Sequence, residues 1–457
     1  MASKTTLTVK SLKTLGARPL AELLMEISKG GAAIKRRLRL ALAAKEGPQE
    51  LAHQVRKRLR EIARSGSYVD STRRKALVAD LDNQRRAIVG DIANGSPADA
   101  LELMWQFLGL AGSVYERCDD SSGVLGDLFA SAREQIGNIA EAATPDPSSL
   151  ADRVFLALQD NGYGEYDGLI GELAPAMGAV GLDHLKSLFS DLSLEQPTTQ
   201  SGGSWRELTL RIALQDIADA QGDVDGFIAQ QSERGATMPG VAAEIAMRLL
   251  AAGRAQEALA ALDAVKLDGP RSISMQWECA RVLVLEALVQ PEEAQLVRWS
   301  AFERSLNAEF LRDYLKRLPD FDDVEAEDRA LDYVLEYENV HSALHFLVSW
   351  PALDRAAQIV VARFEAIDGN FYELLSPAAD KLEMKYPLAA TLLHRAQVDF
   401  TLNKARASRY RHAAHHLTQC KYLASSISDF DRFPTHATYL ANLRSAHARK
   451  SSFWLNM

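Results

Sequence analysis

The sequence predicts an all-α fold, namely an α-solenoid of helical hairpins in which degenerate tetratricopeptide-like repeats follow a basic N-terminal helical region. A helix–turn–helix pattern recurs through the second half, and the period-two alternation typical of strands is almost absent. The clearest copy spans residues 243–265, where Gly253 separates two apolar stretches of helical spacing. A hairpin this short cannot bury its apolar faces alone, so the pattern predicts a stack of similar hairpins.

The first helical region, residues 17–193, consists of amphipathic stretches separated by Gly-, Pro- and Asn-containing breaks. Pro48 suits the first turn of its helix, and Ser96 is the expected N-cap of another. Residues 1–16 contain few apolar side chains, and we expect them to be a flexible segment. Helices are expected at residues 18–28, 34–44, 48–63, 71–93, 98–115, 126–142, 148–159, 166–177 and 182–190.

A polar stretch at residues 194–204 predicts a linker, because it contains Pro197, Gly202 and Gly203 and lacks core residues. The C-terminal repeat region, residues 205–457, follows. Its helices are expected at residues 205–220, 224–234, 241–265 (one hairpin), 275–289, 292–306, 328–337, 341–350, 352–367, 371–384, 387–402 and 409–427.

The spacing of these repeats is irregular. Successive breaks lie about 31, 37, 49 and 30 residues apart, at Gly222, Gly253, Gln290, Asn339 and Gly369. A strict tetratricopeptide array would repeat every 34 residues or so. We therefore expect a degenerate relative, with an insertion at residues 318–326 that shifts the spacing.

Cysteine usage and hydropathy predict a cytoplasmic protein that does not enter a membrane. Cys118, Cys279 and Cys420 are odd in number and far apart, which favours a reducing compartment over a disulfide framework. The N-terminus has no apolar leader segment, and the chain contains no run of about 18 apolar residues.

The charge is distributed unevenly. Residues 1–90 hold 8 Lys and 12 Arg against 8 acidic residues, which gives this segment a charge of +12. Because the whole chain has a net charge of −9, the remaining residues have a net charge of −21. Two interpretations stay open for candidates Arg36, Arg37, Arg56 and Arg60: solvated helix faces that dock on the acidic remainder, or a phosphate-contacting surface for nucleic acid or anionic lipid. Tyr68 is the sole aromatic residue among the first 104, which disfavours single-strand binding by stacking.

Three polar turns are further candidates. The segment 118–123 contains Asp119 and Asp120, which could hold a hard cation, although capping of the next helix explains them more simply. The segment 161–168 contains Tyr163 and Tyr166 and is either a compact turn or a rigid recognition loop. The acidic connection at residues 318–328 carries Phe321, an aromatic residue of a type that is usually buried. It is a solvated loop, a contact for a basic partner or the surface that meets the chain's own basic head, and its candidates are Asp320, Phe321, Asp322 and Asp323.

Histidines occur at helical spacing in two places. His412, His415 and His416 share one expected helix with Cys420, and His341 and His345 share another. That geometry can bind zinc, but neither pair has the His-Glu-x-x-His sequence, so a titrating helix face is the favoured interpretation. Basic and aromatic residues at the start of the first of these helices make an interaction surface, with candidates Arg409, Tyr410 and His412.

Catalytic motifs are absent from the sequence. There is no phosphate-binding Gly-Lys-Ser/Thr loop, no Gly-x-Ser-x-Gly elbow and no assembled Ser/His/Asp or Cys/His set. We therefore expect a protein that is not an enzyme and has no cofactor.

Several segments resemble a bacterial family of unknown function, DUF6880. The clearest are KTTLTVKSLKTLGARPLAELLMEIS (4–28), YERCDDSSG (115–123), LADRVFLALQDNGYGEYDGLI (150–170) and SRYRHAAHHL (408–417), and the resemblance runs to Trp454. It implies one all-α architecture with no assigned activity. The C-terminal half is also similar to helical repeat regions that accompany SWIM zinc fingers, but it lacks their C-x-C…C-x-H ligands, so no zinc role follows.

These observations together predict a protein–protein interaction scaffold or adaptor. A groove of the solenoid would take a peptide or helix from a partner protein, with acidic side chains selecting basic ligands. The alternative is a nucleic-acid-associated regulator that uses the basic N-terminal helices. A metal-binding protein or enzyme is a minor alternative, and the sequence leaves the oligomeric state open.

Overall fold

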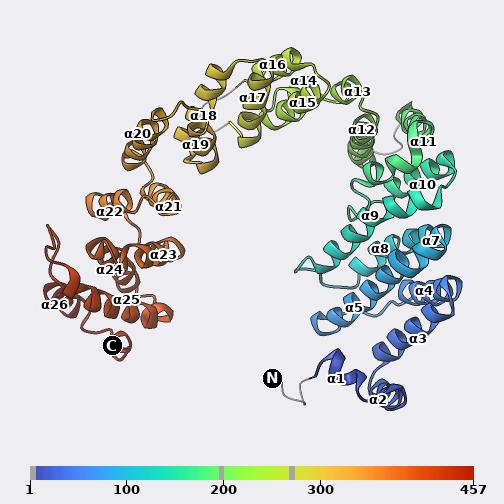
Figure 1. Ribbon diagram of the computed structural model, residues 1–457, viewed down its shortest axis with the longest axis horizontal. Coiled ribbons are helices and arrows are strands. Elements are labelled where there is room, and N and C mark those ends of the chain that lie inside the picture. The colour runs from blue at the N-terminus through green and yellow to red at the C-terminus, as the bar shows by residue number, and fades with distance from the viewer. Residues whose placement is uncertain (1–6, 195–199, 267–272, 457) are drawn as a thin grey trace. The chain divides into compact units, whose positions relative to one another are not determined.

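The computed structural model describes residues 7–194, 200–266 and 273–456, and it confirms the all-α fold (Figure 1). Within these ranges the chain forms no strand. The nearest approach to one is an isolated bridge between Val69 and Cys118.

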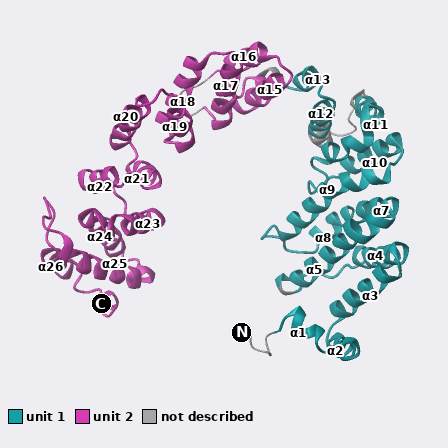
Figure 2. Ribbon diagram, viewed as in Figure 1, with its two compact units in different colours: residues 1–233 teal, residues 234–457 magenta. Residues whose placement is uncertain are grey.

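The chain folds as two compact units, residues 1–233 and residues 234–457 (Figure 2). This boundary lies further along the chain than the expected linker at residues 194–204. Leu194 ends one helix and the next begins at Gln200, so the last five residues of that stretch are helical, while residues 195–199 lie outside the described ranges.

Unit 1 begins with a short helix inside the segment that we expected to be flexible; residues 1–6 of that segment lie outside the described ranges. Thr8 and Ser11 form a reciprocal capping box at the start of this helix. The helices of unit 1 are α1 (Val9–Lys13), α2 (Ala17–Lys29), α3 (Ala32–Glu46), α4 (Pro48–Ala63), α5 (Ser71–Ala87), the π-turn Ile88–Ile92, α6 (Ala93–Gly95), α7 (Pro97–Leu108), α8 (Ala111–Tyr115), α9 (Val124–Ala143), α10 (Pro147–Gln159), α11 (Leu169–Leu194), α12 (Gln200–Gln221) and α13 (Val224–Ala229).

The core of unit 1 lies between α7, α9, α10 and α11, whose apolar faces meet in one buried cluster. Phe107 and Phe129 pack there with ring centroids 5.4 Å apart. Gly137 lets α9 approach α11 closely, since a Cβ at this position would lie 2.4 Å from the Glu172 carbonyl oxygen. Gly178, with φ of +57°, kinks α11 where the sequence predicts the break between two helices.

Helix α14 (Glu233–Ala236) spans the boundary between the units, and the described residues of unit 2 also form helices. They are α15 (Pro239–Ala251), α16 (Ala255–Asp263), α17 (Met275–Ala287), α18 (Pro291–Ser305), α19 (Ala308–Leu315), α20 (Asp322–Glu336), α21 (Val340–Ser349), α22 (Leu353–Ala362), a 3₁₀ turn at Phe364–Ala366, α23 (Tyr372–Leu382), α24 (Pro387–Asn403), a 3₁₀ turn at Ala407–Arg409, α25 (Tyr410–Leu423), a 3₁₀ turn at Ala424–Ser426, α26 (His436–His447) and α27 (Ser451–Trp454).

One type of turn recurs at helix ends and explains the breaks in the sequence pattern. After α12, α15, α17 and α24 a residue takes a positive φ, and the N–H that follows it bonds back to a carbonyl five residues earlier, as in a Schellman motif. The residues with positive φ are Gly222, Gly253, Val289 and Ala405. The predicted breaks at Gly222 and Gly253, and the break beside Gln290, are therefore real helix ends.

Helices of unit 2 alternate between two layers in its C-terminal part. Helix α21 packs on α23, and α22 packs on both α20 and α24, so the two layers run side by side (Figure 1). Helix α19 is not among the helices expected from the sequence; Asn307 caps it by accepting the Glu309 N–H at 2.8 Å. The expected insertion at residues 318–326 is wrong in extent, because α20 already begins at Asp322.

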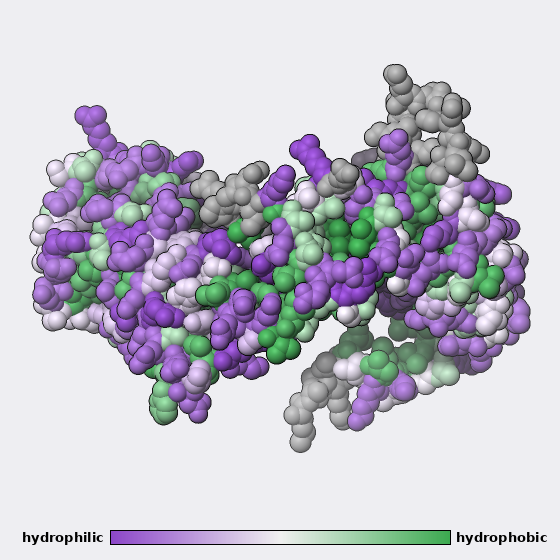
Figure 3. All heavy atoms as spheres, turned by 90° about the horizontal axis from the view of Figure 1, so that it is seen from above, coloured by the Kyte–Doolittle hydropathy of each residue, from purple (hydrophilic) through white to green (hydrophobic). Residues whose placement is uncertain are grey.

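The face shown in Figure 3 mixes hydrophilic residues with smaller hydrophobic patches. Several large apolar side chains remain exposed in unit 2, among them Phe321, Phe371 and Tyr372. Scattered exposed apolar residues are normal, but a group beside a hollow marks an interaction site.

Candidate functional site

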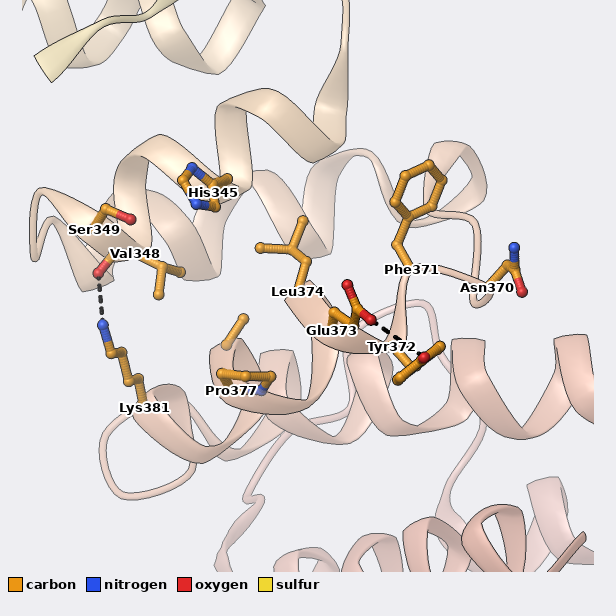
Figure 4. Close-up of a pocket in the computed structure, with 11 residues that line it drawn as sticks. His345, Val348, Ser349, Asn370, Phe371, Tyr372, Glu373, Leu374, Pro377 and Lys381 are labelled. Carbon is orange, nitrogen blue, oxygen red and sulfur yellow. Dashed lines mark hydrogen bonds between the residues drawn. The ribbon is translucent and has the colours of Figure 1, made fainter. Parts of the chain in front are cut away.

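A groove of about 610 Å³ lies between α21 and α23 (Figure 4). It is large enough for a short peptide segment or a small molecule. Its lining comes from α21, α23 and the loop before α23: His345, Val348, Ser349, Asn370, Phe371, Tyr372, Glu373, Leu374, Pro377, Ala378 and Lys381.

The loop before α23 fixes one end of the groove. Gly369 lies against α24 so closely that a Cβ there would be 1.9 Å from the Ala396 carbonyl oxygen. The Asp368 N–H donates to His341 Nε2 at 3.0 Å, and the His341 ring stacks on Phe371 with centroids 4.2 Å apart. These contacts place Phe371 at the rim, where half of it remains exposed.

The floor of the groove is apolar and its rim is polar. Leu374 and Pro377 on α23 face Val348 on α21, while Lys381 Nζ donates to the Val348 carbonyl at 3.2 Å and ties the two helices at the other end. Pro377 has no N–H, so the Glu373 carbonyl on the same helix lacks its usual helical donor. An apolar floor with a few polar groups suits side chains and backbone of a bound peptide.

A second cavity of about 340 Å³ adjoins the groove, because Tyr372 lines both. Arg409 fixes the boundary: its guanidinium lies 4.9 Å from the Tyr372 ring centroid, and its Nη1 donates to Asn370 Oδ1 at 3.0 Å. The cavity is lined by Gly369, Tyr372, Ser376, Gln397, Thr401, Ser408, Arg409, His412, Ala413 and His416.

Two adjacent histidines, the buried His394 and the half-buried His416, lie at this second cavity. His394 Nδ1 and His416 Nδ1 are 3.1 Å apart, and burial lowers the pKa of each to about 4. Both rings are therefore neutral near pH 7, and one Nδ1 donates while the other accepts. Within the described ranges no three His, Cys, Asp or Glu side chains are grouped as a metal site would require.

Of the candidates predicted near this site, some line the second cavity and one is buried in the core. Arg409 and His412 line the second cavity, so the structure brings these two candidates together. Tyr410 is buried and packs on Phe453 with centroids 5.9 Å apart. Tyr410 therefore supports the fold of the site and is not part of its surface.

The basic N-terminal candidates differ in how far carboxylates neutralise them. Arg36 pairs with Asp80 at 3.2 Å, and Arg56 pairs with Asp99 at 3.1 Å. Arg37 and Arg60 are exposed. Asp80 lies within the basic segment itself, so of these two ion pairs only that of Arg56 with Asp99 joins the basic segment to the acidic remainder.

Helix α4 carries a basic stripe on its exposed side. Leu51, Val55, Leu59 and Ile62 bury one side of α4. The exposed side lines a shallow hollow of about 320 Å³. Within that hollow Glu61 is the sole acidic member. We call this surface the α4 stripe; it consists of His53, Arg56, Lys57, Arg60, Glu61 and Arg64.

The acidic turn at Asp119 and Asp120 serves as a helix cap. Asp120 accepts the N–H groups of Leu125 and Gly126, both at 3.0 Å, at the start of α9. Asp119 accepts the Ser121 N–H at 3.0 Å, and this backbone hydrogen bond holds the pKa of Asp119 below its usual value. Both oxygens of Asp120 thus cap α9, while Asp119 holds the preceding turn through Oδ1.

The loop at residues 161–168 is a compact turn. Asn161 accepts the Tyr166 N–H at 2.9 Å and donates to Asp167 Oδ1 at 2.7 Å. Tyr166 is buried near Trp105, and this burial raises its pKa to about 12. Tyr163 is 55% exposed and packs on Tyr115, so Tyr163 alone of the two tyrosines is presented to solvent.

The acidic connection at Asp320–Asp323 opens helix α20. Asp322 and Asp323 lie in its first turn, where carboxylates interact favourably with the helix dipole. By its residue type, Phe321 is expected to be buried. That interpretation is wrong, because Phe321 is 83% exposed and has a φ of +78°.

The groove residues themselves were missed. A signal was present: Phe371 and Tyr372 directly follow the predicted break at Gly369, and Pro377 lies inside a predicted helix. Apolar residues at helical spacing are usually core, so the sequence alone gave no reason to place Leu374 or Val348 beside a cavity.

None of the helices in the described part of the chain has the length and apolar character needed to cross a membrane. No curated protein and no solved structure matches the chain. One family model does, described as a family of unknown function, DUF6880, and it covers residues 2–456. The chain therefore belongs to the DUF6880 family.

Proposed function

We propose that this protein is a non-catalytic interaction scaffold that binds a peptide segment of a partner protein in the groove between α21 and α23. The apolar floor and half-exposed Phe371 of this groove are the observation that carries the proposal. An extended or helical segment can place its apolar side chains there and bond its backbone to the polar rim.

We further propose that unit 2 is a degenerate tetratricopeptide-like array. The first helices of its successive pairs begin 36, 33, 32, 32 and 38 residues apart, at Pro239, Met275, Ala308, Val340, Tyr372 and Tyr410. This spacing is close to the tetratricopeptide period of about 34 residues. Arrays of this kind commonly bind peptides along one layer of helices, which is where α21 and α23 lie.

The test compares partners retained by the tagged full-length chain and by Leu374→Asp, which places a charge in the groove floor. Leu296→Asp is the matched control, because Leu296 is exposed on α18 and lies outside the groove. We expect a partner that survives nuclease treatment to be retained by the wild type and the control and lost from Leu374→Asp. Equal retention by all three folded proteins would exclude the groove.

A second candidate function, nucleic-acid binding, is favoured by the α4 stripe. Lys57 and Arg60 on α4 and Arg64 at its C-cap line one hollow, where all three can contact a phosphate backbone. We therefore expect binding to duplex DNA that weakens with salt. In the triple variant Lys57→Glu/Arg60→Glu/Arg64→Glu, the slope of log K against log salt concentration should be smaller in magnitude by about 3. The control is Lys316→Glu/Lys385→Glu/Arg449→Glu, three exposed cations of unit 2; equal binding by both triples would refute this candidate.

A further inference from the structure

The groove and the second cavity together form one binding surface with two different ends. Tyr372 lines both and separates the apolar groove from the cavity beside Arg409. Val348, Leu374 and Pro377 make the groove end apolar. The cavity end is polar, with the hydroxyls of Ser376, Thr401 and Ser408 among its lining.

The cavity end is also positively charged. No carboxylate is among its lining residues, whereas Arg409 is. Residues 400–428, which include all of α25, contain no Asp or Glu in a chain of net charge −9. The same stretch supplies five cations: Lys404, Arg406, Arg409, Arg411 and Lys421.

Arg409 is pre-positioned to bind an anion. Its Nη1 bond to Asn370 and its contact with the Tyr372 ring use one edge and one face of the guanidinium. A planar guanidinium carries five donors, so further N–H groups remain to bind a carboxylate, which it matches in geometry. The neighbouring His416 is neutral near pH 7, because burial lowers its pKa to about 4. Arg409 is therefore the fixed positive charge of this cavity.

The groove end carries one charged group of each sign. Glu373 lies on its rim and accepts from the Tyr372 hydroxyl at 3.3 Å, and Lys381 lies at the far end of the same groove. One carboxylate and one ammonium make this end roughly balanced. The charge preference of the whole surface is therefore set at the cavity end.

We propose that the peptide bound here is acidic: an apolar side chain enters the groove between α21 and α23, and a neighbouring Asp or Glu carboxylate enters the cavity beside Arg409. This inference rests on the proposed function and adds the partner's chemistry to it. It replaces the sequence-based expectation that acidic side chains would select basic ligands.

The experiment is a selection of random 12-residue displayed peptides on the immobilised full-length protein. Peptides that also bind Leu374→Asp are removed, so that the survivors depend on the groove. The survivors are sequenced, and fluorescein-labelled copies are titrated against the wild type, Arg409→Gln, Arg409→Lys and Arg411→Gln. Arg411 is the matched control, since it lies two residues further along, exposed on α25, and does not line the cavity. Thermal unfolding verifies that each variant is folded.

We expect the survivors to combine an apolar residue with Asp or Glu. Arg409→Gln should weaken their binding about tenfold, and Arg409→Lys should weaken it less, because the charge remains while the planar fork is lost. Arg411→Gln should leave it nearly unchanged. The affinity should also fall as salt is added. Survivors that are neutral or basic, or that bind Arg409→Gln as well as the wild type, would overturn the acidic peptide and leave the groove function standing. A selection that yields no groove-dependent peptide would overturn the proposed function itself.

Discussion

Several side chains of α24 and α25 have ionisation states that burial decides. His394 and His416 share one hydrogen bond, and the pKa of each is about 4 in the folded chain. Nearby Asp399 accepts from the Tyr439 hydroxyl at 2.7 Å, yet burial raises its pKa to about 6. These groups link the stability of the region around the second cavity to pH.

We predict that the histidine pair makes the chain acid-sensitive. Unfolded histidine has a pKa near 6.5, so the unfolded chain takes up protons first as the pH falls. The contribution of the neutral pair to the free energy of unfolding is therefore complete above about pH 6.5 and is lost progressively toward pH 4. For His394 the difference corresponds to about 3 kcal/mol at most. Asp399 acts in the opposite sense, since its raised pKa stabilises the folded chain as the pH falls through about 6.

Urea unfolding at pH 7.5 and pH 5 measures this effect. The loss of stability at pH 5 should be smaller in His394→Gln/His416→Gln than in the wild type, while His53→Gln, an exposed histidine of α4, should behave like the wild type. Removal of the opposing group by Asp399→Asn should make the loss larger. An identical pH dependence in the wild type and the double variant would contradict the prediction.

A second prediction concerns Gly369. A Cβ there would overlap the Ala396 carbonyl, so Gly369→Ala must displace the loop that holds Phe371 at the groove rim. We expect a loss of about 1–3 kcal/mol in the free energy of unfolding, measured by urea titration. Gly162→Ala is the control, because a Cβ at Gly162 would meet no atom within 4 Å. A loss no larger than that of the control would show that the loop can move aside.

At the scale of elements, the recurring helix-end turn links sequence to architecture. Gly253 adopts its φ of +75° at no steric cost, whereas Val289 occupies the same position after α17 with a φ of +59°. A β-branched residue is unfavourable in this left-handed region. The fold tolerates Val289 because packing of α17 against α15 and α18 determines where the chain must turn.

We therefore predict that Val289→Gly stabilises the protein. Relief of the left-handed conformation gains about 1–2 kcal/mol, and the added freedom of glycine in the unfolded chain offsets about 0.5–1 kcal/mol of that. Val289 is 83% exposed, so little burial is lost. The urea midpoint should rise for Val289→Gly and fall for the reciprocal Gly253→Val. A lower midpoint for Val289→Gly would mean that the valine makes contacts that outweigh its backbone cost.

At the scale of the molecule, the chain is two compact units, each with buried apolar clusters of its own. One buried cluster lies entirely in unit 1, and two further clusters lie entirely in unit 2. The α4 stripe belongs to unit 1, whereas the groove and the cavity beside Arg409 belong to unit 2. The two candidate functions thus depend on different units.

We predict that the units lose stability independently. Gly137→Val forces α9 away from α11, because its Cβ would lie 2.4 Å from the Glu172 carbonyl oxygen. Hydrogen exchange followed by mass spectrometry should show faster exchange in α7, α9 and α11, with exchange in α21–α25 unchanged. Faster exchange throughout both units would show instead that they unfold together.

The sequence by itself determined the helical class, most helix positions and the family. Helical spacing of apolar residues and glycine at helix ends are local properties, so Gly222 and Gly253 could be assigned as breaks from the sequence. The interval between Gln290 and Asn339 was predicted to contain an insertion and no helix between residues 306 and 328. It contains α19, which is short and is announced in the sequence only by its N-cap, Asn307. With α19 in place, the repeat spacing is far more even.

Only the tertiary structure decided which residues form the site. The groove combines Val348 with Leu374 and Pro377, and an apolar residue has the same local pattern whether it faces a core or a cavity. Tertiary contacts also decided that Asp80 and Asp99 would neutralise Arg36 and Arg56, while Arg409 would lie in a cavity whose lining has no carboxylate. The periodicity of apolar residues indicates that one face of a helix is covered. Binding depends on which residues lie opposite that face, and these residues are distant in the chain.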